Sequence, residues 1–488
     1  MGKRANAAGR RRTRQTGAIA IVFALMVGGL LAFIGLALDL GRVYNRRSEL
    51  QAVANVAAVA AAAQLNGTAS GIDAAATKAS DAVNELTYQY NQRKIAWNRD
   101  ALSFGASPNG GWIDAAAAHD APAGLLYVQV DTARLGAAMG TLDLVFMRAI
   151  SAALTSTDIA VKAVAGRSGI DVAPLALCAL SNTAAAPRAN PGPPANTELV
   201  EYGFRRGVGY DLMQLNPNGV APENFVIDPF APAGTPGSAA DTAAAFVGPY
   251  ACTGQLAIPS VSGGAITVGR PFPLASLYKQ LNSRFDQYDD ALCSYATAPP
   301  DANIRSYAFN GGAPWMATAP DRQAAKPLAG GGKLLTVADP WPAPAGTTAA
   351  MYGPLWAYAR AVPYASYVAG VAEPAAGYAS FAPGAWSTLY APGAPAATAG
   401  YPGGGSTPYK AGTNLLPPPL AHRGVANRRV LNVALLSCPV SPGATTTATV
   451  LAVGKFLMTV PATATSLYAE FGGVVPEQAL GGPIELYR

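Results

Sequence analysis

Two short patterns contain residue types found in catalytic sites. Ser276 and Lys279 have the S-x-x-K spacing, in which a lysine one helical turn away could activate a serine nucleophile. The S-D-N and K-T-G elements that accompany this pattern in serine enzymes are missing from the sequence, as is G-x-S-x-G. Residues 330–333 read Gly-Gly-Gly-Lys, but they lack the Walker spacing and the Ser/Thr that follows it in a phosphate-binding loop. We therefore expect no catalysis at Ser276 and an ordinary loop at the glycines.

The sequence is also poor in metal-binding residue types. The two histidines, His119 and His422, have no metal-ligand neighbours in the sequence, and the H-E-x-x-H and D-x-S-x-S signatures are absent. Asp286, Asp289 and Asp290 could bind calcium weakly, but three acids in a short polar stretch are more often a solvated turn. The sequence predicts a protein that is not an enzyme, with no cofactor and no metal.

Four cysteines, Cys178, Cys252, Cys293 and Cys438, follow an apolar N-terminal segment. The absence of C-x-x-C spacing argues against zinc-ribbon and thioredoxin-type sites. An even number of cysteines outside the cytoplasm favours two disulfides, for which three pairings are open, and the alternative is four separate buried thiols.

An uncharged run of 21 residues, Ala18–Leu38, follows a basic tail at 1–17 and precedes all of the residues discussed above. At about 1.5 Å per residue, the run spans roughly 30 Å, the thickness of the hydrocarbon core of a bilayer. Six basic residues precede the run, so the positive-inside rule places the N-terminus in the cytoplasm and the bulk of the chain outside it. The helical pattern continues over 39–67 and stops at Asn66-Gly67.

Two other interpretations of this run are open. Residues 35–37, Gly-Leu-Ala, would suit signal-peptide cleavage, although the run is longer than the usual apolar region of about 7–15 residues. A buried helix of a soluble core is the second alternative. Within the run, a small residue recurs every four positions, which predicts either a face for packing against another membrane helix or a chance effect of composition. These residues are Ala20, Ala24, Gly28 and Ala32.

The net charge of +6 does not indicate nucleic-acid binding. Nine of the 34 basic residues but only one of the 28 acidic residues lie in residues 1–47, which leaves the rest of the chain at −2. The excess positive charge is therefore part of the membrane signal, and we expect no nucleic-acid partner.

We expect an α+β fold, with one transmembrane helix (18–38) extended into a long helix (39–67), followed by a large, loop-rich, β-dominated extracytoplasmic region. Residues 68–170 are expected to form a small α/β module, with helices over 72–92 and 142–154 and strands over 125–130 and 158–165. The remaining expected regions are a turn-rich β region at 171–310, which includes a strand over 202–215, a Pro/Gly/aromatic-rich region at 311–420, and a C-terminal β segment at 421–488 with strands over 429–437 and 448–460.

Residues 311–420 contain 17 of the 40 prolines, four of the six tryptophans and eight of the 21 tyrosines. Because disordered segments are poor in aromatic residues, this composition favours an irregular but packed region over a Pro-rich stalk. Such an aromatic surface would also suit an envelope-anchored adhesin or scaffold.

The N-terminal segment, Arg14–Ala63, resembles that of the TadE/TadG-like proteins of Flp (Tad) pilus assembly. The resemblance rests on the sequences RQTGAIA at 14–20, LDLGRVY at 38–44 and LQAVANVAA at 50–58. Family members usually have Asp where Asn55 stands. A looser similarity covers 127–165, including Phe146-Met147-Arg148, and 428–457, and the chain length and cysteine content are similar to those of TadG-type proteins.

The resemblance implies a non-enzymatic, single-pass component of Flp pilus assembly in the bacterial inner membrane. It would act as a pilin-like tether or scaffold on the periplasmic side, in the assembly of adhesive pili. Its implied partners are the lipid bilayer, other pilus-assembly membrane proteins and minor pilin-like proteins. Prepilins of this system are cut after a Gly that has a Glu at the fifth position beyond it. Here Gly17 is followed by Ala18 and, at that distance, by Val22, so we expect this junction to stay uncut.

Overall fold

The computed structural model describes residues 16–88, 93–122, 124–151, 153–167, 169–190, 192, 194–231, 235–259, 264–289, 292–308, 315, 328–330, 333–335, 348, 351–369, 371, 373–374, 376–391, 393, 398–402, 406–412, 415–476 and 479–487. The chain divides into two compact units. Unit 1 contains residues 1–65, 69–166 and 484–488, and unit 2 contains 66–68 and 167–483. Most of the basic tail at 1–17 lies outside the described residues, as does Trp341.

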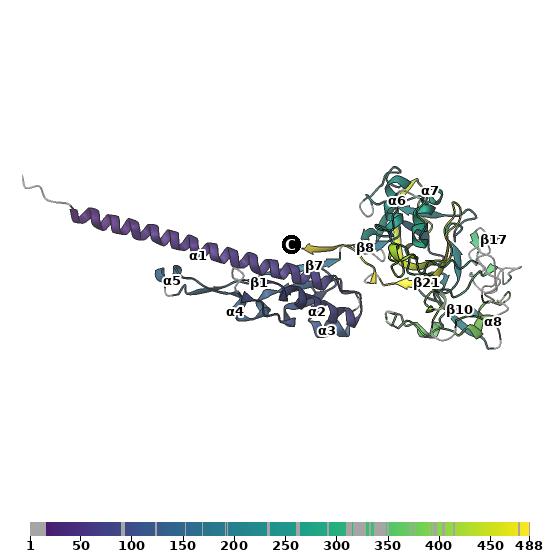
Figure 1. Ribbon diagram of the computed structural model, residues 1–488, viewed down its shortest axis with the longest axis horizontal. Coiled ribbons are helices and arrows are strands. Elements are labelled where there is room, and N and C mark those ends of the chain that lie inside the picture. Colours follow the sequence, from purple (N-terminus) through teal and green to yellow (C-terminus); the bar gives the residue numbers. More distant parts are fainter. Residues whose placement is uncertain are drawn as a thin grey trace, which may run out of the picture. The chain divides into compact units, whose positions relative to one another are not determined.

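Unit 1 is built on a helix of 47 residues, α1 (Thr16–Ala62), which confirms the expected long N-terminal helix. Its C-terminal half packs against α2 (Ala69–Asn84) and against a sheet with the order β22-β7-β4-β3 (Figure 1). The strands of this sheet are β3 (Leu102–Gly105), β4 (Tyr127–Asp131), β7 (Lys162–Arg167) and β22 (Ile484–Tyr487). The pairs β3–β4 and β4–β7 are antiparallel, with Val128 opposite Phe104 and Ala165.

The last strand of unit 1 comes from the C-terminus of the chain. β22 pairs with β7 at the edge of the sheet, although more than 300 residues separate them in sequence. Tyr487 on β22 stacks edge-on against Tyr127 on β4, with ring centroids 5.3 Å apart. Unit 2 is therefore an insertion between two adjacent strands of unit 1.

Three sequence predictions for unit 1 need correction. The helix expected over 72–92 ends at Asn84, and β1 (Thr87–Tyr88) and β2 (Arg93–Lys94) follow it. The helix expected over 142–154 is a hairpin of β5 (Thr141–Asp143) and β6 (Ser156–Asp158), with only one short helix, α5 (Met147–Ile150), in its loop. The strand expected over 158–165 begins instead at Lys162. The remaining short helices of the unit are α3 (Ala115–Asp120) and α4 (Ala137–Gly140).

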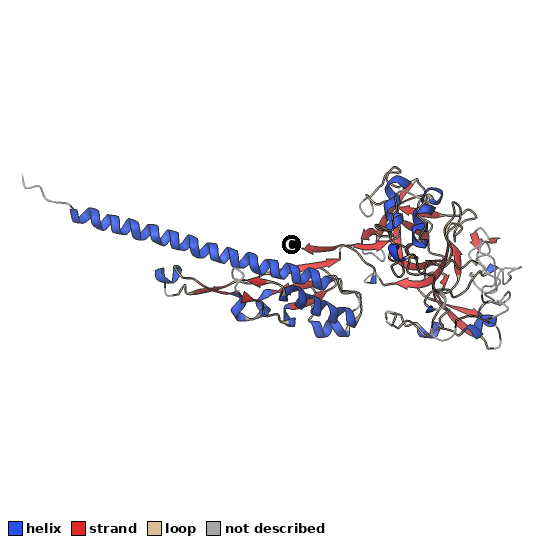
Figure 2. Cartoon of the chain, viewed as in Figure 1, coloured by secondary structure: helices blue, strands red, loops and turns tan. Residues whose placement is uncertain are grey.

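Unit 2 is β-rich and full of loops, as expected (Figure 2). Its main sheet has the order β13-β21-β20-β16-β14-β9-β19, and a further pairing of β19 with β20 closes a circuit of five strands. The strands are β9 (Leu175–Cys178), β13 (Gly209–Asp211), β14 (Asn224–Ile227), β16 (Ala265–Gly269), β19 (Val430–Leu436), β20 (Thr445–Met458) and β21 (Tyr468–Val475). The antiparallel pair of β19 and β20 confirms the two strands expected near the C-terminus.

The other elements of unit 2 are short. They comprise β8 (Gly169–Val172), β10 (Ala186–Asn190), β11 (Asn196–Glu201), β12 (Phe204–Arg205), β15 (Leu256–Pro259), β17 (Leu328–Gly330), β18 (Lys333–Leu335), α6 (Ala244–Thr253), α7 (Leu274–Asn282) and α8 (Trp386–Leu389). The strand expected over 202–215 is broken, because Tyr202, Gly203 and Gly207 have positive φ and turn the chain between β11 and β13.

Alternate residues of the main sheet face two cores. Leu175 and Leu177 on β9 lie in the larger core, whereas Ala176 and Cys178 lie in the second. The larger core also takes in aromatic residues from the described part of 311–420, including Trp356, which is fully buried. Sequence ranges that we expected to form separate regions, 171–310 and 421–488, thus supply strands to one sheet, and the described aromatic residues between them pack on it.

Candidate functional site

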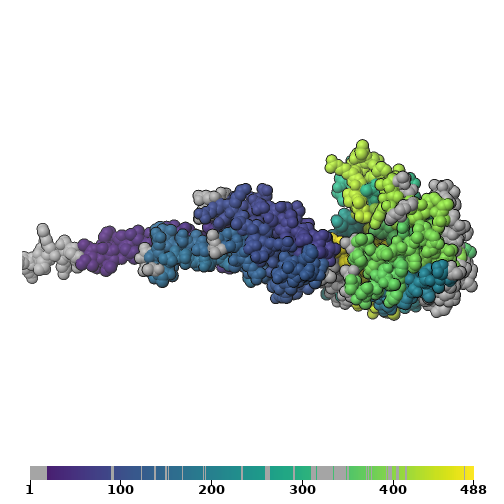
Figure 3. Space-filling view, turned by 90° about the horizontal axis from the view of Figure 1, so that it is seen from below, coloured from purple at the N-terminus to yellow at the C-terminus, as the bar shows by residue number. Residues whose placement is uncertain are grey.

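The first half of α1 exposes its apolar side chains on all sides. Ile19, Leu25 and Phe33 are each more than 70% exposed, although water would not favour so large an apolar surface. Among the described residues, α1 is the one helix that is long and apolar enough to cross a membrane. Figure 3 shows this purple stretch projecting beyond the rest of unit 1.

The second half of the same helix is part of the core of unit 1. Leu50, Ala54, Ala57, Ala58 and Ala61 are fully buried, and they contact α2 and the sheet. Alanine at these positions lets the backbones approach closely while it preserves strong helix propensity. Gln51 donates a hydrogen bond of 2.9 Å to Asn55. Because α1 is continuous, its bare half and its buried half form one element.

Asp39 joins the two halves of α1 to the β5–β6 hairpin. Its side chain is fully buried, and its carboxylate accepts hydrogen bonds from the backbone N–H groups of Val145 (3.2 Å), Phe146 (2.9 Å) and Met147 (2.8 Å). Arg42 lies 3.6 Å from the same carboxylate and donates a hydrogen bond of 3.0 Å to the carbonyl of Asp143. We call this set of contacts the Asp39 clamp.

The Asp39 clamp lies on the same helix face as part of the predicted small-residue stripe. With about 3.6 residues per turn, Gly28, Ala32, Gly35 and Asp39 follow one another on one side of α1. A Cβ atom at Gly35 would lie 2.7 Å from the Cβ atom of Phe146, so only glycine lets the hairpin approach here. A Cβ atom at Gly28 would meet no atom within 4 Å. Packing of another helix on Ala20, Ala24, Gly28 and Ala32 stays a prediction, and Gly17 and Ala18 lie in the first turns of α1.

The residues considered for chemistry in the sequence lie on different elements of the two units. Ser276 and Lys279 are both exposed on α7, and the Gly-Gly-Gly-Lys stretch at 330–333 includes the ends of two short strands, β17 and β18, with Gly331 and Gly332 outside the described residues. His119 is half-exposed and lies 3.5 Å from Asp73.

Within the acidic stretch near 286, Asp289 is exposed, as expected of a solvated turn, whereas Asp286 is not. Asp286 is largely buried and lies 2.5 Å from Nδ1 of His422, whose ring stacks on Tyr295 at 4.2 Å. Asp290 lies outside the described residues. Among the residues that the structure describes, no group of three His, Cys, Asp or Glu side chains is arranged to hold a metal ion.

The four cysteines form two disulfides, Cys178–Cys438 and Cys252–Cys293. The first joins the ends of the parallel neighbours β9 and β19, which are far apart in sequence. The second holds the end of α6 to the segment that follows α7. Both disulfides therefore act within the fold of unit 2.

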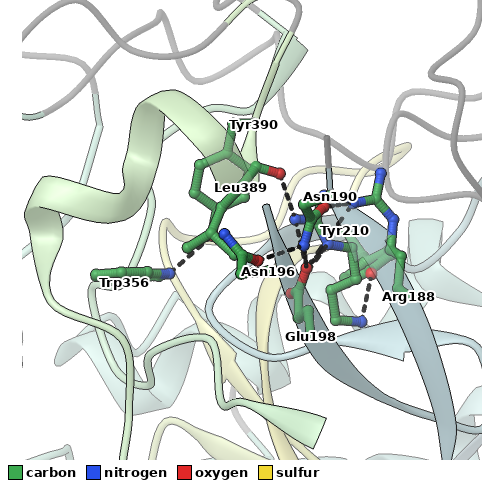
Figure 4. Close-up of polar contacts among 9 residues, drawn as sticks. Arg188, Asn190, Asn196, Glu198, Tyr210, Trp356, Leu389 and Tyr390 are labelled. Carbon is green, nitrogen blue, oxygen red and sulfur yellow. Dashed lines mark hydrogen bonds and ion pairs between the residues drawn. The ribbon is translucent and has the colours of Figure 1, made fainter. Parts of the chain in front are cut away.

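A buried polar cluster in unit 2 contains the ion pair of Glu198 and Arg205 (Figure 4). Glu198 on β11 and Arg205 on β12 are both fully buried, and their side chains are hydrogen-bonded at 2.7–3.0 Å. Arg205 also donates a hydrogen bond of 2.9 Å to the carbonyl of Leu389 on α8. Burial and the nearby Arg205 lower the pKa of Arg188 to about 10. The Glu198–Arg205 pair is closed to solvent, and its contacts hold β10–β12 against α8.

Comparison with known proteins bears on α1 alone. Residues 17–64 match the model of a family described as putative Flp pilus-assembly TadE/G-like. This segment is similar to a Tad domain. It coincides with α1 and covers about a tenth of the chain, and it supports a role in Flp pilus assembly. No match was found among curated proteins or among solved structures.

Sequence reasoning found the Tad domain helix but missed the Asp39 clamp. The available signal was a single acid directly after 21 uncharged residues, which we interpreted only as the end of the run. The residues that satisfy this acid lie more than 100 positions away.

Proposed function

We propose that this protein is a non-enzymatic tether or scaffold of the TadG type in Flp pilus assembly. It is held in the bacterial inner membrane by α1, with its N-terminus in the cytoplasm and units 1 and 2 in the periplasm. The observation that carries the proposal is the continuity of α1, whose first half is bare and apolar and whose second half is the spine of a folded unit. Its 47 residues extend over roughly 70 Å, enough to cross a bilayer and continue into unit 1.

The packing around Gly35 supports a helix that is kept intact. The expected alternative of signal cleavage would cut at 35–37, where α1 runs without interruption and Phe146 lies against Gly35. At the pilin-like junction, Val22 stands where prepilins have Glu. Both observations favour a permanent tether over a processed pilin.

Charge and cysteine chemistry support the orientation. The basic residues precede the apolar half of α1, and both disulfides lie on its C-terminal side, as an oxidising periplasm would allow. The bilayer, other pilus-assembly membrane proteins and minor pilin-like proteins are then the expected partners, at the exposed face of α1 and on the surfaces of the two units.

A deletion strain tests the proposal. We expect surface pili to be lost in electron micrographs and to return when the intact gene is supplied. A Ser276→Ala variant should restore pili as well as the wild type does, because the proposal assigns no chemistry to Ser276. Normal pili combined with lost adhesion would contradict the proposal and favour an adhesin.

A further inference from the structure

The loop of the β5–β6 hairpin carries an exposed apolar surface. Val145, Phe146 and Leu154 are 45%, 43% and 39% exposed, and Arg148 is the one charged residue in the sequence from 144 to 155. Soluble loops of this length usually carry more polar residues, because water must solvate them. We call this loop the hairpin tip. In Figure 1 its helix, α5, lies beside α1 at the end of unit 1 nearest the bare half of α1.

The Asp39 clamp fixes the position of the hairpin tip along α1. Three successive backbone amides of the tip bind Asp39, and Phe146 packs on Gly35, one turn closer to the N-terminus. Gly35 lies inside the uncharged run that ends at Leu38, about 5 Å from its end at 1.5 Å per residue. If the run fills the hydrocarbon core, the tip lies at the depth where that core meets the headgroups.

The surroundings of the tip have the chemistry of a membrane interface. Ile34 and Leu38 on α1 are about half exposed and extend the apolar surface of the tip. Arg42 and Arg148 lie on the two elements that meet there, and both reach solvent, so they can bind lipid phosphates. Apolar side chains beside a few basic ones are typical of segments that lie in the interfacial layer.

We propose that the hairpin tip inserts Val145 and Phe146 into the interfacial layer of the bilayer and forms a second membrane contact beside α1. This inference rests on the proposed membrane span of α1. A single helix leaves a unit free to tilt on the membrane, whereas a second contact fixed to it by the Asp39 clamp sets the orientation of unit 1. The occupant of this apolar surface is thus the lipid bilayer.

The test uses the full chain reconstituted in vesicles of neutral and anionic phospholipids. The environment-sensitive fluorophore NBD is attached at a single added cysteine, in separate Val145→Cys and Phe146→Cys variants, while the native cysteines stay in their disulfides. The Phe146→Cys variant removes the aromatic ring that is proposed to enter the bilayer. The Val145→Cys variant keeps this ring, so it reports on a tip that still has its main apolar side chain. Leu31→Cys, in the bare half of α1, is the control inside the membrane, and Asp120→Cys, on the surface of unit 1, is the control in water.

We expect blue-shifted emission and strong quenching by lipids that carry a shallow nitroxide at both tip positions, with little quenching at position 120. Quenching at position 31 by lipids that carry a deep nitroxide, without quenching at the tip, overturns the inference and leaves the span of α1 intact. Absence of quenching at position 31 by the deep nitroxide overturns the proposed span itself. A tip that neither lipid nitroxide nor aqueous iodide quenches is covered by protein, and that result also overturns the inference.

Discussion

Replacement of Asp39 by alanine tests whether one carboxylate holds the hairpin tip on α1. The carboxylate is fully buried and accepts three backbone hydrogen bonds of 2.8–3.2 Å. A hydrogen bond to a charged group contributes about 1.5–3 kcal/mol, but water can replace part of this because Val145 and Phe146 are half-exposed. We therefore expect Asp39→Ala to cost roughly 3 kcal/mol in the free energy of local opening, or on the order of 100-fold in its equilibrium constant.

The assay is hydrogen exchange of the full chain in lipid vesicles, read at the amides of 145–147. Their protection should fall on the order of 100-fold in Asp39→Ala and roughly 10-fold in Asp39→Asn, which keeps one acceptor oxygen. The amide of Leu144 is an internal control, since it bonds the carbonyl of Thr155 across the hairpin and should keep its protection.

Asp81→Asn is the matched control variant, because Asp81 forms only an exposed ion pair with Lys78 on α2. It should leave the tip amides unchanged. Protection at 145–147 that stays within about 3-fold of wild type in Asp39→Ala would refute the reasoning, since 3-fold is less than 1 kcal/mol. The hairpin tip would then be held by something other than this carboxylate.

Three further predictions concern other parts of the chain. Gly28→Leu should weaken co-purification with a membrane partner and leave hydrogen exchange in unit 1 unchanged, because a Cβ atom there has no described atom within 4 Å; unchanged co-purification would count against a packing face. Burial raises the pKa of Glu470 from 4.5 to about 7 against three backbone hydrogen bonds, so the free energy of unfolding of unit 2 should fall as pH rises from 4.5 to 7, by about 3 kcal/mol, and level off above that. In a urea titration, Glu470→Gln should flatten this slope, and an unchanged slope would exclude Glu470 as its source. Loss of the disulfide across 260 residues, Cys178→Ser with Cys438→Ser, should lower the unfolding midpoint more than loss of the disulfide across 41, since the entropy terms are about 6 and about 4 kcal/mol; the reverse order would contradict the loop-entropy argument.

The features that could be predicted from sequence are those with local patterns. The apolar run and its helical continuation predicted α1, and the alternation near the C-terminus predicted β19 and β20. The even number of cysteines favoured two disulfides but left their pairing open, because pairing depends on which strands become neighbours.

The features that sequence reasoning missed depend on partners far along the chain. Residues 142–154 have a helical pattern, yet three of their backbone N–H groups donate hydrogen bonds to Asp39. The residues on either side pair as β5 and β6. β22 is four residues long, and its place depends on partners far away in sequence, namely its pairing with β7 and the contact of Tyr487 with Tyr127. Strands of three or four residues carry too short an alternation to be distinguished from loops.

The central claim is that α1 remains whole, with its first half as the membrane tether and its second half as the spine of unit 1. The most direct measurement is N-terminal peptide mapping and intact mass of the protein recovered from the membrane fraction of cells that make pili. The account predicts one membrane-bound species that retains the residues before Ala18. A mature N-terminus at Ala18, as in a prepilin, or at Leu38, as after signal cleavage, would contradict it.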